Sequence, residues 1–580
     1  MKSCEAPYTL LGFLLQKDQP GSRTCSVEEG FHFFRDYAIR VINILLWVSL
    51  ILVTGLLLRK VTRLLRLWEK GRKIPGPPCP SFYGHVKLFS GGKSGETLTD
   101  FLSKSHEQYG SIVRLWLGPT QLLVSVKDPS IIKEVLVKAE DRLPLTGRVF
   151  RLAFGYSNLF VPSFEKVRKR RESLAIQLNG RLIERANAIS SKVVDFVMQK
   201  IDPVMSKGIL DCRSVSQHMA FSILGATLLG DGFLSWSNAT VYEELLMMIA
   251  KDASLWASYK VPPFWKRGFW RYQILCKRLK CLTQDFIRHC RQNYKLFSLM
   301  DRNSHGATAT VGRDTAFGVF CTGLDMEDES LLDEFNGHND AKEEPCGNIM
   351  GVMFHGCLTT AGLISDILTR LVMHPELQEK IYSEIVMVKK RSPKSELEDV
   401  YKMYFLLATV YESARLLPAG PLLKRCSLKH DLNLQEGIAI PAGAIMVVPV
   451  QLVQMDGSNW GSDANQFNPY RFLSKAEQGS DSVPLSSFAG VEEKLNAANS
   501  PFVLNDPNAN SAFLPFGSGT RACVGQKIAI LGIMMLFASL LEQYEIKLQP
   551  GSENDAEPMM KNCVLPLLPS PKIIFVRRND

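Results

Sequence analysis

One cysteine near the C-terminus lies in a loop whose composition could hold a metal ion. Residues 516–525 read FGSGTRACVG, so Cys523 follows Arg521 within a glycine-rich turn. A thiolate that ligates iron needs backbone N–H groups close to it, and glycine lets the main chain turn sharply and approach closely. Arg521 suits an anionic cofactor, because a guanidinium pairs well with carboxylates. A lone cysteine in such a turn is more often inert, so the surrounding pattern is what indicates a metal–thiolate site.

The same ten residues resemble the haem-binding loop of the cytochrome P450 family, F-x-x-G-x-R-x-C-x-G, and every fixed position of that pattern is filled. In that family a thiolate ligates the haem iron and favours O–O cleavage. The resemblance implies haem b (iron protoporphyrin IX) as the cofactor and Cys523 as its metal ligand. It also implies that the loop binds the haem through Phe516, Gly517, Gly519, Arg521 and Gly525.

The opposite face of such a haem would be covered by a long helix, expected here from about residue 348 to 374. The family pattern A/G-G-x-D/E-T-T is matched by Gly356 and Thr359, but not by His355 and Leu358. The resemblance implies that Gly356 leaves space for dioxygen and that the Thr359 hydroxyl supports a water chain that delivers protons. Without the resemblance, a threonine in a helix most often bonds back to a carbonyl. Because leucine cannot carry a proton, we expect another proton route.

His355 is the second departure from that pattern. It lies four residues before Thr359 and therefore on the same helical face, which would direct it toward the haem cavity. Three roles are open: proton relay, substrate contact and approach to the iron. The alternative is a histidine whose ring is satisfied by a helix carbonyl.

Further charged residues follow in the family's order. Glu412 and Arg415 share one face of a predicted helix, and the segment FNPYRF at 467–472 resembles the family's P-x-R-F segment. The resemblance implies that Arg471 completes a structural triad with that pair, which alone would be a solvated surface pair. Arg425 is expected at a haem propionate.

The family often has W-x-x-x-R in another helix near the propionates, and here Phe164 takes the tryptophan position. The resemblance implies that Arg168 keeps its propionate contact, whereas Phe164 has no N–H to donate. We interpret the basic residues 169–171 as a solvated face or a docking patch. A basic surface there would suit an acidic flavoprotein that donates electrons.

An apolar segment near the N-terminus predicts a membrane anchor. Residues 41–58 carry no formal charge, and the span extends to residue 38 if Arg40 snorkels. Residues 59–73 hold seven basic side chains against Glu69 alone, and the positive-inside rule keeps this flank cytosolic. The segment PGPP at 75–78 would end the helix and resembles the proline-rich hinge of microsomal members. We therefore expect a luminal tail at 1–37, an anchor at 38–58, a linker and hinge at 59–78, and a catalytic domain at 79–580.

The remaining sequence predicts a mainly α fold with a minor β region, the cytochrome P450 fold by resemblance. Strand-like stretches lie chiefly at 112–126 and 572–577, and polar stretches at 303–345 and 474–511 resemble insertions. The thirteen cysteines are scattered without a C-x-x-C pair, so we expect free thiols. Most of the net charge of +10 lies beside the anchor, which gives no reason to expect nucleic-acid binding.

The resemblance implies a single-pass protein of the endoplasmic reticulum membrane, with its catalytic domain in the cytosol. It would be a haem-thiolate monooxygenase that inserts one atom of dioxygen into a lipophilic small organic substrate. The sequence has no dinucleotide fingerprint, so electrons would come from NADPH-cytochrome P450 reductase, with cytochrome b5 as a second candidate donor. Leu358 leaves open a haem-thiolate isomerase or dehydratase that needs no reductase. His355 leaves open a non-enzymatic haem-binding protein, if it ligates the iron.

Overall fold

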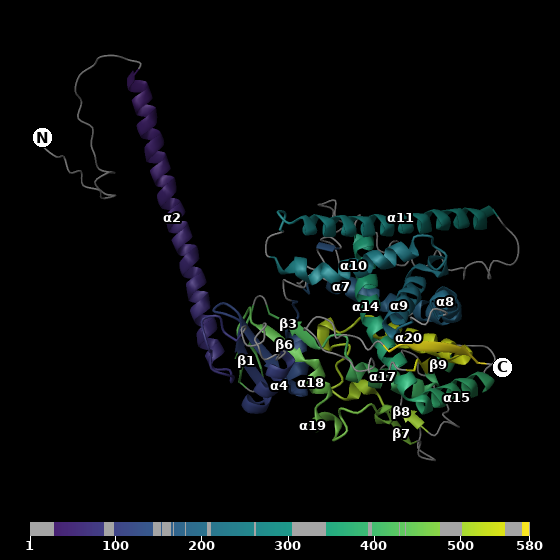
Figure 1. Ribbon diagram of the computed structural model, residues 1–580. Coiled ribbons are helices and arrows are strands. Elements are labelled where there is room, and N and C mark those ends of the chain that lie inside the picture. Colours follow the sequence, from purple (N-terminus) through teal and green to yellow (C-terminus); the bar gives the residue numbers. More distant parts are fainter. Residues whose placement is uncertain are drawn as a thin grey trace. The chain divides into compact units, whose positions relative to one another are not determined.

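The computed structural model describes residues 28–85, 98–142, 152–153, 164–165, 167–179, 181–205, 210–259, 263–303, 344–391, 397–427, 430–434, 437–475, 502–550 and 571–578. The chain divides into two compact units, Met1–Glu69 and Lys70–Asp580. Helices dominate and the sheets are small, which confirms the predicted mainly α fold with a minor β region (Figure 1). Most of the predicted tail at 1–37 and of the predicted insertions at 303–345 and 474–511 lies outside the described residues.

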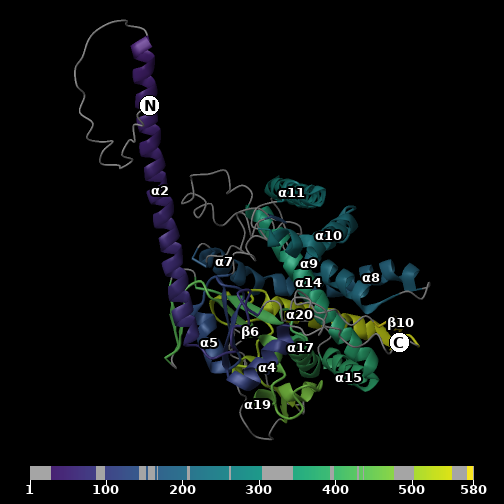
Figure 2. The ribbon, with the colours of Figure 1, turned by 60° about the vertical axis from the view of Figure 1, so that its left-hand side comes forward.

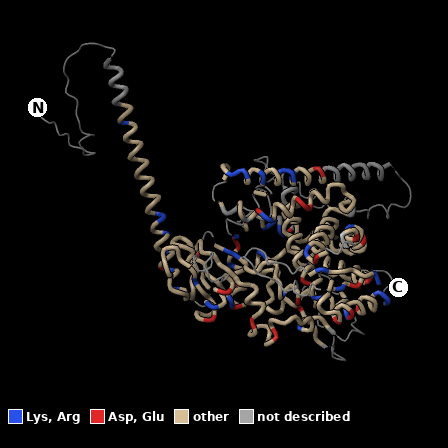
Figure 3. The backbone as a smooth tube through the Cα atoms, viewed as in Figure 1, with Lys and Arg blue, Asp and Glu red and all other residues tan. Residues whose placement is uncertain are grey.

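Helix α2 (Glu28–Arg72) contains the apolar segment that predicts an anchor. Its candidate membrane span, Tyr37–Arg72, reaches a mean hydropathy of 2.6, and none of that apolar window is buried. Figure 3 shows the long stretch of this helix without charged residues. Two other described helices are long and apolar enough to cross a bilayer, but 67% and 72% of their apolar windows are buried inside the protein. Those two are core helices, whereas α2 is a candidate transmembrane helix.

Helix α2 ends at Arg72, three residues before the first proline of the PGPP segment. Its last turn belongs to the second unit and packs closely on strand β1 (Ile112–Trp116), because a Cβ added at Gly71 would lie 2.9 Å from the Trp116 ring. Nη1 of Arg114 donates to the carbonyls of Arg72 at 2.7 Å and Ile74 at 2.8 Å. The bond to Arg72 satisfies a carbonyl that the helix end leaves without an intrahelical partner.

The second unit is built around two buried helices, α14 (Glu344–Met373) and α20 (Gln526–Gln543). Helix α14 packs against α9 (Cys212–Leu229), and α20 packs against α8 (Arg181–Met205), as Figure 2 also shows. The predicted helix at 348–374 corresponds to α14. The other helices are α4 (Leu98–Tyr109), α5 (Pro129–Lys138), α7 (Arg168–Asn179), α10 (Ala239–Ser258), α11 (Arg267–Asn303), α15 (Pro375–Arg391), α16 (Leu397–Tyr401), α17 (Tyr404–Leu416), α18 (Val450–Gln454) and α19 (Gly457–Trp460).

The largest sheet has the strand order β1-β2-β6-β3. The expected strand stretch at 112–126 forms two antiparallel strands, β1 and β2 (Leu122–Val126), on either side of a turn that contains Gly118 with φ of +92°. Strand β2 pairs in parallel with β6 (Ile445–Pro449), and β6 pairs antiparallel with β3 (Leu422–Arg425). Two-stranded antiparallel sheets are β4 (Leu432–Asn433) with β5 (Ala439–Ile440), β7 (Leu473–Lys475) with β8 (Phe502–Leu504), and β9 (Tyr544–Leu548) with β10 (Ile573–Arg577).

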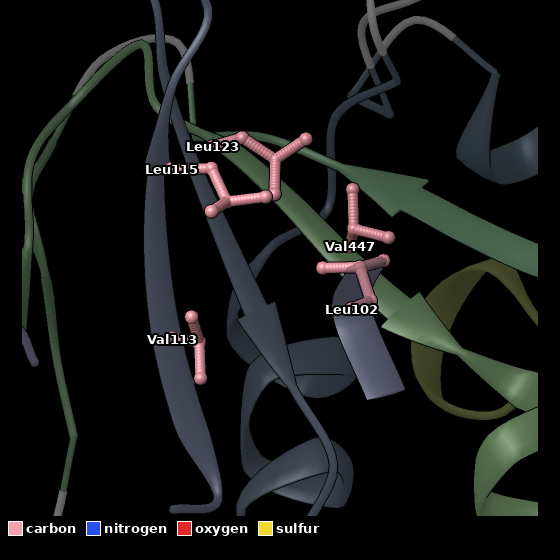
Figure 4. Packing of buried hydrophobic residues seen from close by; sticks show 5 residues of the cluster. All are labelled: Leu102, Val113, Leu115, Leu123 and Val447. Atoms are coloured by element: carbon pink, nitrogen blue, oxygen red, sulfur yellow. The ribbon is translucent and has the colours of Figure 1, made fainter. Parts of the chain in front are cut away.

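The large sheet packs on α4 through a cluster of buried aliphatic side chains (Figure 4). The cluster consists of Leu102, Val113, Leu115, Leu123 and Val447. Just beyond strand β3, the N–H of Cys426 donates to the carbonyl of Asp141 at 3.1 Å. This bond joins the segment after α5 to the end of β3, and so brings the arginines next to these two residues toward the same part of the molecule.

Candidate active site

The loop that contains Cys523 leads directly into α20. Gly517 and Gly519 both have φ of +71°, in the left-handed region that favours glycine. A Cβ added at Gly519 would lie 2.4 Å from the carbonyl oxygen of Leu136, so glycine is needed where the loop approaches α5. The N–H of Cys523 donates to the carbonyl of Phe516 at 2.9 Å and closes the loop. The glycines thus supply the sharp turn and the close approach that the sequence predicts.

The thiol of Cys523 keeps exposed surface although protein surrounds it. Burial raises the pKa of the thiol, whereas the Gly525 N–H and the guanidinium groups of Arg171 and Arg142 lower it. A group that is both surrounded and accessible borders a space inside the protein rather than its outer surface. The sulfur also lies before the N-terminal end of α20, which favours negative charge. The surroundings therefore suit a thiolate that binds a metal cation.

Four arginines lie near one another beside this loop, namely Arg142, Arg171, Arg425 and Arg521, and the charges of Arg142 and Arg171 act on the sulfur. The pKa of Arg142 is lowered to about 9, first by burial and then by the charges of the other three, while the thiol raises it. Burial and neighbouring arginines also lower the pKa of Arg425 and that of Arg521 to about 10. A guanidinium stays protonated at neutral pH even so. Like charges gathered in a partly buried place favour an anionic ligand.

The hydrogen bonds of this arginine cluster leave room for such a ligand. Nη2 of Arg171 donates to the carbonyl of Ala522 at 2.7 Å, and Nε of Arg521 donates to the carbonyl of Glu140 at 2.8 Å. Nη1 of Arg425 donates to the preceding carbonyl at 3.1 Å, but its buried Nε has no hydrogen-bond partner among the described residues. A buried donor without a partner costs about 1–3 kcal/mol. The residues present therefore fit a cofactor that carries carboxylates beside a metal.

Arg168 does not join the arginine cluster. Its side chain is 64% exposed, and its Nε lies 3.6 Å from the Glu172 carboxylate. Arg171, which the sequence assigns to a solvated or docking face, lies beside the cysteine loop instead, almost one helical turn further along α7. The propionate contact of Arg168 stays a prediction, and Arg171 is the basic residue of α7 that the structure places beside the loop. Phe164 still contributes, because the Arg521 guanidinium lies 5.1 Å from the centre of its ring.

Helix α14 carries the predicted distal residues. The His355 side chain is exposed, yet burial lowers its pKa to about 4, with the Arg142 charge as the second cause. His355 therefore also borders an internal space, and Arg142 acts on both His355 and Cys523. Oγ1 of Thr359 donates to the His355 carbonyl at 2.9 Å, as the structural alternative for this threonine predicts. Its oxygen lone pairs can still accept a hydrogen bond.

Gly356 lies where α14 meets α9. A Cβ added at this position would lie 3.2 Å from a methyl group of Leu224, so glycine allows the two helices to approach closely. This contact gives Gly356 a packing role, and the predicted space for dioxygen stays a prediction. The neighbouring Cys357 is buried, and burial raises the pKa of its thiol well above the usual range.

The predicted structural triad is confirmed. Nε and Nη2 of Arg415 donate to the two carboxylate oxygens of Glu412 at 2.7 and 2.8 Å, and neither side chain is exposed to solvent. Nε of Arg471 lies 3.6 Å from Glu412, which also accepts from the N–H of Asn468 at 2.9 Å. Glu412 and Arg415 are therefore buried and hydrogen-bonded to each other, and Arg471 adds an ion pair to Glu412, which gives the triad an architectural role.

Gln454 connects the triad to the cysteine loop and was not predicted from the sequence. Its carbonyl accepts from Nη1 of Arg415 at 2.5 Å, and its Nε2 donates to the Arg415 carbonyl at 2.6 Å. Its Oε1 accepts from the N–H of Leu514 at 2.9 Å, two residues before the loop begins. A glutamine without a neighbouring motif gives no signal of this role, because only the folded chain brings α18 between these elements.

Comparisons with known proteins agree with this arrangement. The family model named Cytochrome P450 matches residues 74–575. The chain is 25% identical to Cytochrome P450 3A31 of Mesocricetus auratus, over 92% of this chain and 97% of that protein. It is also 25% identical to Cytochrome P450 734A1 of Arabidopsis thaliana, over 88% of this chain and 92% of that protein. Cytochrome P450 4F6 of Rattus norvegicus is 26% identical, over 82% of each chain. The chain therefore belongs to the cytochrome P450 family, whose members are haem-thiolate monooxygenases.

Proposed function

We propose that this chain is an endoplasmic reticulum monooxygenase that inserts one atom of dioxygen into a lipophilic small organic substrate. The loop of Cys523 carries the proposal, because it gathers a thiol and buried cationic groups at one place. Haem b bound there would supply the iron that activates dioxygen. The residues that would hold it are Phe516, Gly517, Gly519, Arg521, Cys523 and Gly525 in the loop, and Arg142, Arg171 and Arg425 around it.

Different residues of this site would have different roles. The Gly525 N–H and nearby guanidinium groups hold the thiolate charge of Cys523. The arginine cluster would bind the two carboxylates of the cofactor, and a carboxylate there would satisfy the buried Nε of Arg425. The triad is joined through Gln454 to Leu514, just before the loop, so we assign the triad and Gln454 to cofactor incorporation rather than to the chemical step.

Proton handling would fall to Thr359 and His355. The Thr359 proton is engaged with a helix carbonyl, so its oxygen is free to accept from a water molecule. Because its pKa is about 4, His355 is neutral at physiological pH and can pass a proton between water molecules without retaining it. This relay would replace the acidic side chain that the family pattern has at the position of Leu358.

Electrons would arrive from NADPH-cytochrome P450 reductase, with cytochrome b5 as a second donor. Arg168 and Lys169 are exposed at the start of α7, in the same helix as the Arg171 that contacts the cysteine loop. An acidic flavoprotein that docked on this basic end would therefore lie on the thiolate side of the site. Helix α2 would hold the protein in the membrane, with the catalytic domain in the cytosol.

Incorporation of labelled oxygen tests the proposed reaction. Full-length protein in lipid vesicles is incubated under ¹⁸O₂ with the reductase, NADPH and a panel of lipophilic compounds. We expect a product that carries one ¹⁸O atom and forms only with reductase and NADPH. An unlabelled product that forms without reductase would support the isomerase or dehydratase that Leu358 leaves open. Stable haem with no product and no carbon monoxide binding would support a non-enzymatic protein.

A further inference from the structure

We propose that His355 is a nitrogen ligand of the haem iron in the resting protein, on the face opposite Cys523, and that bound substrate displaces it. The inference deepens the proposed function and rests on it, because it requires a haem held by the Cys523 thiolate. It concerns one exchange of ligands, in which an Fe–N bond forms as an Fe–water bond breaks, and no electron is transferred.

The position of His355 is the first argument. Its side chain keeps accessible surface, yet the protein around it desolvates the ring, so it faces an interior space. Cys523 has the same combination of exposure and desolvation. Arg142 acts electrostatically on both groups, although they lie on elements far apart in the sequence. The imidazole and the thiol therefore border the same site from different elements.

The chemistry of the neighbouring side chains is the second argument. Cys357 is buried with its thiol protonated, and the Thr359 hydroxyl is bonded to helix carbonyls. Leu358 has no donor atom. His355 is thus the strongest ligand that this turn of α14 offers, and a neutral imidazole is a common ligand of iron. Its ring stays neutral because burial and the positive charge of Arg142 both oppose protonation.

Such a ligand would act as a gate for the site. Dioxygen needs an open coordination position, so a ligated His355 keeps the resting protein inactive until substrate occupies the site. The apparent affinity for any added iron ligand equals its intrinsic affinity multiplied by the fraction of molecules in which His355 is not bound to the iron. If about 90% of the resting protein is ligated by His355, removing the imidazole tightens binding of added ligand about tenfold.

The test is electron paramagnetic resonance of the ferric full-length protein labelled with ¹⁵N-histidine. We expect a low-spin signal with hyperfine coupling to histidine nitrogen, and its loss in His355→Ala and in His355→Gln. Added ¹⁵N-imidazole should restore the coupling to a nitrogen ligand in His355→Ala and bind about tenfold more tightly than to the unchanged protein. His374→Ala is the matched control, because His374 directly follows the same helix and has a side chain 45% exposed, and the signal of this variant should not change.

The outcomes separate this inference from the proposed function. A thiolate-ligated haem whose signal has no histidine coupling, or keeps it in both His355 variants, overturns the role of His355 and leaves the monooxygenase proposal standing. A protein that binds no haem through Cys523 overturns the proposed function itself. The glutamine variant retains a polar side chain of similar length, so a folding defect in the alanine variant alone does not decide the result.

Discussion

Glu412→Gln is the substitution that tests the buried triad most sharply. The change keeps the shape of the side chain and removes its charge, which leaves the Arg415 guanidinium buried without its counter-ion. Both side chains are fully buried, and two hydrogen bonds of 2.7 and 2.8 Å join them. Removing one partner of a buried ion pair costs about 3–5 kcal/mol. A domain is stable by only about 5–15 kcal/mol, so this loss is a large share of the total.

The assay is urea unfolding of the haem-loaded protein, followed by Soret absorption and circular dichroism, together with haem content per chain. Glu545→Gln is the matched control, because Glu545 and Lys547 form a pair at 3.1 Å with side chains 36% and 52% exposed. We expect that control to change the free energy of unfolding by about 0–1 kcal/mol. If Glu412→Gln were as stable as the control and kept its full haem content, the architectural role of the triad would be refuted.

Three further predictions concern the cysteine loop, the arginine cluster and a buried carboxyl. Gly519→Ala should lower the haem content of the protein, because the added Cβ would lie 2.4 Å from a carbonyl oxygen. Gly532→Ala is the control and should keep the full haem content, because a Cβ there meets open space. Equal haem content in the two variants would contradict the prediction. Arg171→Ala should weaken haem binding about tenfold to a hundredfold in haem titrations, through loss of a charged hydrogen bond. Arg168→Ala is the control and should not weaken it. A larger loss of haem affinity in Arg168→Ala than in Arg171→Ala would contradict the assignment. Burial raises the pKa of Glu384 from 4.5 to about 7, so the folded chain holds a proton that the unfolded chain releases. Stability should therefore fall by about 3 kcal/mol as pH rises from 4.5 through 7, and Glu384→Gln should flatten that profile in urea unfolding at several pH values.

The sequence predicts those parts of the site that lie within short motifs. The loop around Cys523 and the contact of Glu412, Arg415 and Arg471 follow from the resemblance to family motifs, and the structure places them as expected. The apolar segment in α2 and the helix α14 follow from length and composition. In each case the signal lies within a few neighbouring residues.

The remaining parts depend on where the folded chain brings distant segments. Arg142 carries no motif and reaches the site because the neighbouring Asp141 pairs with Cys426 beyond β3. Arg171 rather than Arg168 lies at the loop because the direction of α7 is set by its packing. The parallel pairing of β2 with β6 joins segments more than 300 residues apart, and no local pattern specifies it.

The most direct test of the account is the reduced carbon monoxide difference spectrum of the purified chain and of Cys523→Ala. We predict the band of a thiolate-ligated haem in the unchanged protein and its loss in the variant, because Cys523 is the sulfur that the loop and the arginine cluster surround. A chain without haem, or a variant that keeps the thiolate band, would contradict the assignment of this site.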